Sequence, residues 1–477
     1  MATQVKNLIA GEWTGEPQTE RRNPARPDDV VAVSPSSSAE TVSDAIGAAE
    51  AAQPAWAEMA PAARGAILMD AADILRQRHT DVATDLVREE GKTLTEAKGE
   101  VRRAIDVLRY FGSAGWRLTG ETTPSAFPNT MVYTRREPLG VIGLITPWNF
   151  PIAIPAWKLA PALVSGNTVV LKPAGLTTLT AMNLVKALVD AGLPAGVLNL
   201  VTGRGSVVGD AIVNDDRVRA VSFTGSTEVG LGIHDAMSRR RARVQLEMGG
   251  KNALVVLDDA DIEASAMVAA AAGFSLTGQA CTATSRVFCT PKALGPFIEA
   301  VRRQAERYQP GDGLEEGILM GPVVSQSQLE TDVNAVRRAE KEGATVVAGG
   351  KEPNGLFYAP TLLADVAPDA DVIRNEVFGP VVAVAEVSDL DEAITRVNDS
   401  RYGLTAGIAT TNLASAQHFA AKAHVGVVKV NRPTTGLDLN TPFGGTKDSS
   451  SNTWREQGPT AMEFYTWTKT VYLGHDR

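Results

Sequence analysis

The sequence predicts an α/β fold, in which a doubly wound parallel sheet is followed by a second α/β unit and a small antiparallel element. Short apolar runs alternate with helical segments from Gly140 onward, as buried parallel strands and their crossover helices do. A second series of this kind begins after Gly250. Two further segments, 131–137 and 463–473, alternate apolar and polar residues, which is typical of antiparallel strands with one open face.

The elements follow in this order along the chain. Up to about residue 115 we expect a short strand at 7–13 and alanine-rich helices at 38–60 and 64–78. The first sheet is expected to hold strands 141–145, 168–171, 197–201 and 220–223, with helices at 178–191, 206–214 and 227–238. The second series is expected to hold strand 253–257, helix 262–273 and strand 381–385, and to end near residue 447. Ligands of such sheets bind at the carboxyl ends of the strands.

Length and composition exclude several classes of protein. With 477 residues the chain is too long for one core of usual size, so two or three units are expected. No apolar run approaches the roughly 18 residues of a membrane span, and no secretory signal precedes residue 30, so we expect a cytoplasmic protein without membrane contact. The net charge of -9 argues against a nucleic-acid partner. Two cysteines and five scattered histidines predict neither a disulfide framework nor a metal site.

The segments 131–137 and 463–473 are expected to belong to one structural element. An exposed β-edge is a liability unless another strand pairs with it. We therefore predict that the two segments form a flap that assembles subunits.

Cys281 and Glu247 are a candidate nucleophile and base. Cys281 lies in a run of small residues, 278–282, that can expose its sulfur, and the start of a following helix can lower the pKa of the thiol. Glu247 lies upstream in the run 246–251. Considered alone, a cysteine among small residues is more often a buried apolar side chain than a nucleophile.

Polar or glycine-rich turns follow three of the predicted strands, where ligand contacts are expected. Asn149 offers an amide that can donate to an oxyanion, although it also suits a turn cap. Lys172 follows the next strand. Gly225 and Ser226 open a helix whose free N–H groups suit a pyrophosphate, a signal that is weak without other motifs.

Taken together, these motifs resemble those of the aldehyde dehydrogenase superfamily, essentially from end to end. Six motifs occur in the order and spacing of that family: Pro147-Trp148-Asn149-Phe150-Pro151, Phe223-Thr224-Gly225-Ser226, Leu246-Glu247-Met248-Gly249-Gly250-Lys251, Gly278-Gln279-Ala280-Cys281, Glu376-Val377-Phe378-Gly379-Pro380 and Pro442-Phe443-Gly444-Gly445. The resemblance implies a Rossmann-like NAD(P)-binding domain, a catalytic domain and an oligomerisation flap in a homodimer or homotetramer. The implied boundaries are 1–119 with 140–249, 250–447, and 120–139 with 460–477.

The resemblance also implies a mechanism. Cys281 attacks the carbonyl of a small-molecule aldehyde, and Asn149 with the Cys281 backbone N–H forms the oxyanion hole. Transfer of a hydride to the nicotinamide leaves a thioester, which Glu247 hydrolyses by activating water. Lys158 matches a family lysine close to the reacting centre.

The cofactor residues are carried over by motif. Lys172 resembles the lysine that holds the adenine ribose, Ser226 beside Gly225 the pyrophosphate contact, and Glu376 with Phe378 the nicotinamide-ribose clamp. Ile145, Trp148 and Gly205 resemble further contacts. Gly175 stands where relatives that prefer NAD often carry a glutamate, so we expect NADP or NAD, because no carboxylate repels a 2′-phosphate.

The predicted substrate tunnel is lined by Phe150, Trp157, Arg103 and Phe443, with Ala153, Ala280, Thr282 and the loop 434–439. Succinate-semialdehyde dehydrogenases place arginines where this chain has Trp157 and Ser275, which weakens that assignment. A guanidinium at Arg103 suits a carboxylate, unless it belongs to a solvated helix face.

Residues 432–451 resemble a bacterial and archaeal subgroup that oxidises α-ketoglutaric semialdehyde (2,5-dioxopentanoate) to 2-oxoglutarate in pentose and sugar-acid catabolism. The alternatives are a succinate-semialdehyde, ω-amino-aldehyde or broad-range enzyme, and a non-catalytic member that only binds nucleotide or serves as a structural subunit.

Overall fold

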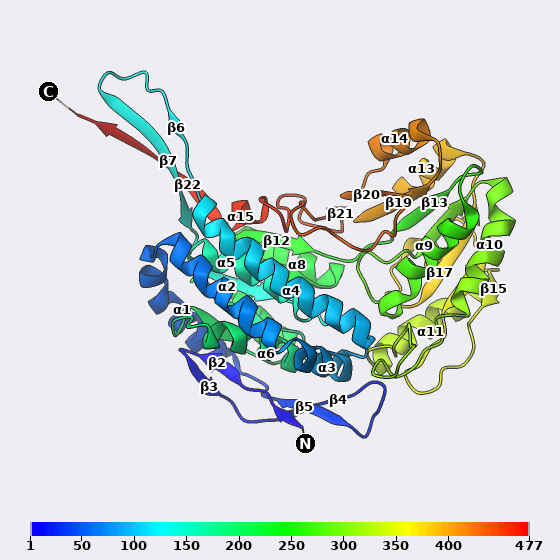
Figure 1. The fold of residues 1–477 in the computed structure, drawn as a ribbon, viewed down its shortest axis with the longest axis horizontal. Coiled ribbons are helices and arrows are strands. Elements are labelled where there is room, and N and C mark those ends of the chain that lie inside the picture. The colour runs from blue at the N-terminus through cyan, green and yellow to red at the C-terminus, as the bar shows by residue number, and fades with distance from the viewer. Residues whose placement is uncertain (1, 476–477) are drawn as a thin grey trace.

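The first large sheet has seven strands and forms the core of the lobe drawn in blue to green (Figure 1). The computed structural model describes residues 2–475. The strand order is β12 (Arg243–Glu247), β11 (Val218–Thr224), β8 (Val141–Ile145), β9 (Thr168–Lys172), β10 (Leu198–Leu200), β2 (Asn7–Ile9) and β3 (Glu12–Thr14). Neighbouring strands from β12 to β10 run parallel, whereas β2 and β3 join antiparallel. Every residue of β8 and β9 is buried, as expected for strands covered on both faces.

Helices cover both faces of this sheet. One apolar core joins it to α2 (Pro61–Gln77), α3 (His79–Glu90), α4 (Leu94–Ala114), α5 (Ala153–Val164) and α6 (Thr178–Asp190). A second core on the other face joins it to α1 (Ala39–Glu58), α7 (Asp210–Asn214) and α8 (Thr227–Arg239). This arrangement is the predicted doubly wound sheet.

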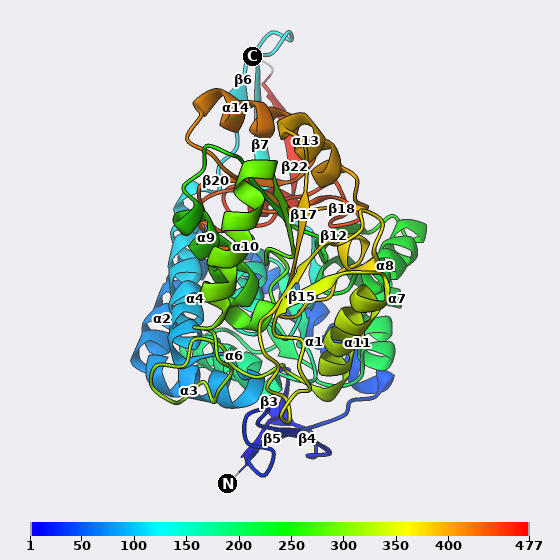
Figure 2. The same ribbon diagram turned by 90° about the vertical axis from the view of Figure 1, so that its right-hand side faces the viewer.

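A second seven-stranded sheet forms the other lobe, drawn in green to orange (Figures 1 and 2). Its order is β15 (Thr345–Ala348), β16 (Thr361–Ala364), β17 (Val381–Glu386), β14 (Arg286–Cys289), β13 (Ala253–Val256), β19 (Thr405–Ala409) and β20 (Val427–Val430). Neighbouring strands are parallel except at β15. Its helices are α9 (Ile262–Phe274), α10 (Pro291–Ala305), α11 (Gln326–Lys341), α12 (Asp371–Arg374), α13 (Leu390–Asn398) and α14 (Leu413–Lys422).

An antiparallel arm projects from the body of the molecule (Figure 1). It contains β6 (Thr122–Thr123), β7 (Thr130–Pro138) and β22 (Thr466–Gly474). β7 and β22 pair along their whole lengths. The two alternating segments of the sequence therefore lie side by side, although more than 300 residues separate them.

The remaining short elements are β1 (Thr3–Gln4), β4 (Thr19–Arg22), β5 (Val30–Ser34), β18 (Tyr402–Gly403), β21 (Thr446–Lys447) and α15 (Ala461–Phe464). β1, β5 and β4 form a small sheet near the N-terminus, and β18 pairs with β21. Among residues 2–475, no helix combines the length and apolar composition that a membrane crossing requires.

Three local predictions were wrong. The strand expected at 7–13 is a hairpin, because Ala10 and Gly11 adopt positive φ angles of 52° and 88° and reverse the chain. The helix expected at 206–214 begins as a wider π-helical turn, Gly205–Gly209, before α7. The strand expected from residue 463 begins only at Thr466, after the helical turn α15.

Candidate active site

Cys281 follows a tightly bent loop between α9 and β14. Leu276, Thr277 and Gly278 have φ angles of 54°, 57° and 67°, in the left-handed region that residues other than glycine seldom adopt. The half-buried Cys281 side chain lines two cavities, of about 370 Å³ and about 290 Å³. The bent loop thus places the thiol where the two cavities meet.

Asn149 lies on the loop between β8 and α5 and lines the smaller cavity together with Cys281. Its side-chain amide donates a hydrogen bond to the carbonyl oxygen of Gln279 over 2.9 Å. An amide nitrogen carries two hydrogens, so the second is left for an oxygen in the cavity. The predicted oxyanion donor and nucleophile are therefore brought together by the fold.

Glu247 ends β12 and is buried. Neither of its carboxylate oxygens accepts a well-formed hydrogen bond from another residue between 2 and 475. Burial, followed by the nearby carboxylate of Glu456, raises the pKa of Glu247 well above its usual range, and the Lys158 ammonium opposes this effect only in part. Glu247 is thus kept as a weak acid, which is the property of a general base that works near neutral pH.

Lys158 does not reach either cavity. Its ammonium donates to Ser222 Oγ over 2.8 Å and forms a fully buried ion pair with Glu456. Ser222 in turn donates to Gln245 Oε1 over 2.8 Å. Lys158 therefore belongs to a series of hydrogen-bonded polar side chains beside Glu247.

Cys281 is followed by a turn and then by β14, rather than by the helix that was expected to lower the pKa of its thiol. Burial, followed by the carboxylates of Glu247 and Glu376, raises the pKa of the Cys281 thiol above its ordinary value. Formation of the thiolate thus requires that its proton be taken up nearby.

A groove of about 930 Å³ opens at the carboxyl ends of the strands of the first sheet. Six of the predicted cofactor residues line it, namely Ile145, Trp148, Lys172, Gly205, Gly225 and Ser226. Burial lowers the pKa of Lys172 to about 8, and among residues 2–475 its ammonium donates only to the carbonyl oxygen of Pro173, over 3.2 Å. Ser226 precedes α8 without a side-chain cap, so the first N–H groups of the helix remain available. A buried cation and a helix N-terminus that line one groove fit the phosphate and ribose of a dinucleotide.

The last two cofactor residues, Glu376 and Phe378, line the 290 Å³ cavity with Cys281. The Phe378 and Trp148 rings meet edge to face, with centroids 5.5 Å apart. Glu376 Oε1 accepts the Gly250 N–H over 2.8 Å, and burial raises the pKa of this carboxyl to about 7. The segment 376–378 thus lines this cavity together with the loop that carries Asn149.

The larger cavity holds all four predicted substrate contacts: Arg103, Phe150, Trp157 and Phe443. Trp157 and Phe443 form an aromatic wall, with ring centroids 6.3 Å apart. Arg103 is half-buried at this wall, and its guanidinium donates to Gln457 Oε1 over 2.5 Å. The thiol at one end thus faces a cavity that carries a cation.

Several residues of the site were missed in the sequence. Glu456 and Gln457 gave no signal, because Lys158 and Arg103, which they bind, lie 298 and 354 residues away in the sequence. Glu96 and Glu100 also line the larger cavity. Their spacing from Arg103, on successive turns of one helix face, could have revealed them.

Comparisons with known proteins identify the family of this chain. The profile of the aldehyde dehydrogenase family matches residues 13–471. An alpha-ketoglutarate semialdehyde dehydrogenase of Haloferax volcanii is 47% identical over 99% of both chains. A 2,5-dioxopentanoate dehydrogenase of Saccharolobus solfataricus is 45% identical over 95% of both chains.

Solved structures show the same fold. An NADP-dependent enzyme of E. coli superposes with a TM-score of 0.96 at 33% identity, covering 99% of this chain and 98% of the other. An NAD+ complex of an aldehyde dehydrogenase from Bacillus cereus superposes with a TM-score of 0.95 at 36% identity, covering 99% of this chain and 97% of the other. The predicted fold class and the predicted resemblance are both confirmed. The chain belongs to the aldehyde dehydrogenase family, as an NAD(P)-dependent enzyme that oxidises aldehydes.

Proposed function

We propose that the protein oxidises α-ketoglutaric semialdehyde to 2-oxoglutarate. The observation that carries the proposal is the Arg103 guanidinium, which lines the same cavity as the Cys281 thiol. A guanidinium binds a carboxylate in bidentate fashion and selects an aldehyde that bears one. The names of the Haloferax and Saccharolobus relatives support this substrate.

Cys281, Asn149 and Glu247 divide the chemistry between them. The Cys281 sulfur adds to the aldehyde carbon, and the Asn149 amide donates to the oxygen on which negative charge develops. A bound nicotinamide cofactor supplies the hydride acceptor. The acyl group then remains on Cys281 as a thioester. Glu247 takes a proton from water, the resulting hydroxide attacks the thioester carbon, and the carboxylic acid leaves as the sulfur is released.

We propose Lys172, Ser226, Glu376 and Phe378 as the main cofactor contacts, and NADP as the preferred cofactor. A β-carbon at Gly175 would meet no atom within 4 Å, so the turn after β9 leaves open space. Lys172 beside it has no carboxylate partner among residues 2–475 and suits a 2′-phosphate.

We infer a cofactor domain at 1–119 and 140–249, a catalytic domain at 250–447, and an oligomerisation arm at 120–139 and 460–477.

The arm exposes large apolar side chains at Phe127, Met131, Tyr472 and Leu473, which favours burial against a second copy. We expect a dimer or tetramer by light scattering, and loss of that assembly when Tyr472 and Leu473 are both changed to Asp. A monomeric wild type would contradict the assignment. A cytoplasmic location stays a prediction.

The substrate proposal is tested by initial rates. α-Ketoglutaric semialdehyde, succinic semialdehyde and a neutral aldehyde of similar length are each oxidised with NAD and with NADP, in wild type and Arg103→Leu. We expect a preference of roughly tenfold or more in kcat/KM for the first substrate, and its loss in the variant. Equal turnover of the neutral aldehyde by wild type would favour a broad-range or ω-amino-aldehyde enzyme.

A further inference from the structure

The first two turns of α4 touch both loops of the site. We infer that Glu96 is a positioning residue that holds the Cys281 loop in register with Asn149, with Lys92 and Glu100 supporting the Asn149 side. The inference rests on the proposed roles of Cys281 and Asn149.

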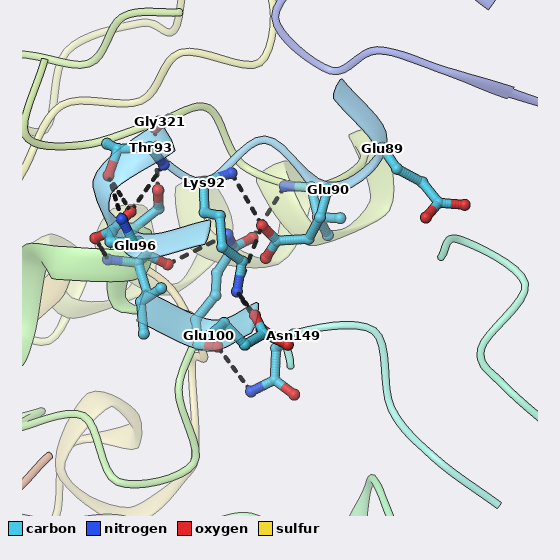
Figure 3. A network of polar contacts seen from close by, with 12 residues as sticks. Glu89, Glu90, Lys92, Thr93, Glu96, Glu100, Asn149 and Gly321 are labelled. Carbon is cyan, nitrogen blue, oxygen red and sulfur yellow. Dashed lines mark hydrogen bonds and ion pairs between the residues drawn. The ribbon is translucent and has the colours of Figure 1, made fainter. Parts of the chain in front are cut away.

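A network of hydrogen bonds surrounds the start of α4 (Figure 3). Thr93 caps the helix by accepting the Glu96 N–H, and Glu96 Oε2 accepts the Thr93 N–H and hydroxyl, both over 2.8 Å. The Glu96 side chain therefore has little freedom. Glu100 lies one turn further along the same face.

Glu100 and Lys92 form hydrogen bonds with backbone groups of the Asn149 loop and of the start of α5. Glu100 Oε1 accepts the N–H groups of Ile152 and Ala153, over 3.0 and 3.2 Å, at the start of α5. Glu100 Oε2 accepts from the Lys92 ammonium over 2.6 Å, and this ammonium also donates to the Asn149 carbonyl oxygen over 2.8 Å. Both charged side chains are almost fully buried, so the contacts exclude water.

Glu96 holds the opposite loop. Its Oε1 accepts the N–H of Leu276 over 2.7 Å. Leu276 and Thr277 adopt positive φ angles, which are unfavourable for residues that have a β-carbon. Contacts from other segments are therefore needed to stabilise this turn. A hydrogen bond from a backbone N–H to a carboxylate is stronger than one to a neutral acceptor. The Thr277 hydroxyl adds a bond to the Gly321 carbonyl oxygen over 3.0 Å.

One short helical segment of the first lobe is thus bonded to the loop of the oxyanion donor and to the loop of the nucleophile. The two loops also meet directly, through Asn149 and Gln279. Misplacement of a reacting group by about 1 Å lowers a rate about 100-fold, so this shared support sets the geometry of the first chemical step.

Glu96 also lines the substrate cavity, but direct action on the substrate does not fit its contacts. Both of its carboxylate oxygens already accept hydrogen bonds from the protein. The contacts therefore favour positioning over substrate binding.

The test compares Glu96→Ala with Glu96→Gln, which keeps an acceptor for the Leu276 N–H. Arg102→Ala is the control on the same helix, because Arg102 is exposed and, within the described part of the chain, pairs only with Asp106. We measure the pre-steady-state formation of reduced nicotinamide, the alkylation rate of Cys281 by iodoacetamide, the Kd of NADP and the melting temperature.

We expect Glu96→Ala to slow the pre-steady-state step roughly 10- to 100-fold and to change the alkylation rate at least about threefold, with the Kd of NADP within about twofold of wild type. Glu96→Gln should recover to within about threefold of wild type, and Arg102→Ala should match it. If the alanine variant does not fold, Glu96→Asp, whose carboxylate falls short of Leu276 by one methylene, should show the same losses.

The inference is overturned if Glu96→Ala, or Glu96→Asp in its place, reacts within about twofold of wild type. It is also overturned if Glu96→Gln is as slow as Glu96→Ala, or if the losses follow a general fall in melting temperature and NADP affinity. A wild-type protein that oxidises no aldehyde would instead contradict the proposed function.

Discussion

The side-chain amide of Asn149 donates a hydrogen bond to the Gln279 carbonyl oxygen over 2.9 Å, across 130 residues of sequence. Asn149 leaves the first sheet at β8, whereas Gln279 belongs to the loop that presents Cys281. This single bond therefore joins the two lobes at the reacting centre. It also orients the amide of Asn149, a residue that lines the same cavity as Cys281 and keeps a second amide hydrogen to donate.

Asn149→Ala should lower kcat roughly 100- to 1000-fold, because one oxyanion donor is lost. The Kd of NADP should change little. Steady-state rates and a fluorescence titration check this. Asn199→Ala is a matched control, since Asn199 is also buried but its side chain bonds to Ala10 and Gly196 of the first lobe. A smaller effect at Asn149 than at Asn199 would contradict the oxyanion role.

The pH dependence of hydrolysis should reflect Glu247. The base is active when ionised, and burial raises the pKa of its carboxyl, so the rate should fall as the pH drops through this raised value. Glu247→Gln should slow thioester hydrolysis at least about 100-fold while one equivalent of reduced nicotinamide still forms per active site. Rapid-mixing experiments between pH 5 and 9 measure both steps. A variant that turns over with an unchanged profile would refute the assignment.

Gln457→Leu should weaken recognition of the carboxylate. Gln457 Oε1 accepts a hydrogen bond from the Arg103 guanidinium. The Nε2 atom of Gln457 is buried without a partner among residues 2–475. Leucine removes the acceptor while nearly keeping the volume. We expect KM for α-ketoglutaric semialdehyde to rise about three- to tenfold and kcat/KM for a neutral aldehyde to change less than about twofold. Equal effects on both substrates would indicate a general packing defect.

Gly175→Glu should move the cofactor preference toward NAD. The side chain enters open space, where its charge repels a 2′-phosphate and its oxygens suit the ribose hydroxyls. We expect the ratio of kcat/KM for NADP over NAD to fall at least about tenfold. Gly175→Gln is the uncharged control and should shift the ratio much less. The same shift in both variants would point to size rather than charge.

Breaking the Lys158 and Glu456 pair should destabilise the fold strongly. Both side chains are buried, so Lys158→Met leaves an uncompensated carboxylate and should cost about 3–5 kcal/mol. The double variant Lys158→Met with Glu456→Leu should regain most of that loss, because neither charge remains. Urea unfolding of the three proteins at one subunit concentration measures this. Equal losses in single and double variants would show that packing dominates.

The sequence was sufficient for the parts of the site that local chemistry specifies. Cys281, Asn149 and Glu247 stand in short runs whose residue types are needed for the reaction, and most of the strands were predicted from apolar runs. Ends of elements were predicted less well. The turn at Ala10 and Gly11 depends on backbone angles that the apolar pattern of 7–13 does not encode.

By itself the sequence determined the α/β class and the two series of strands, and it carried the motifs from which the reacting residues are proposed, because periodicity and short motifs are local properties. Only the tertiary structure decided which side chains meet. It paired Lys158 with Glu456 and Arg103 with Gln457, and it placed Glu96 against Leu276. These contacts join residues far apart in sequence, and their strength comes from burial that exists only after the two lobes and the C-terminal segment have packed together.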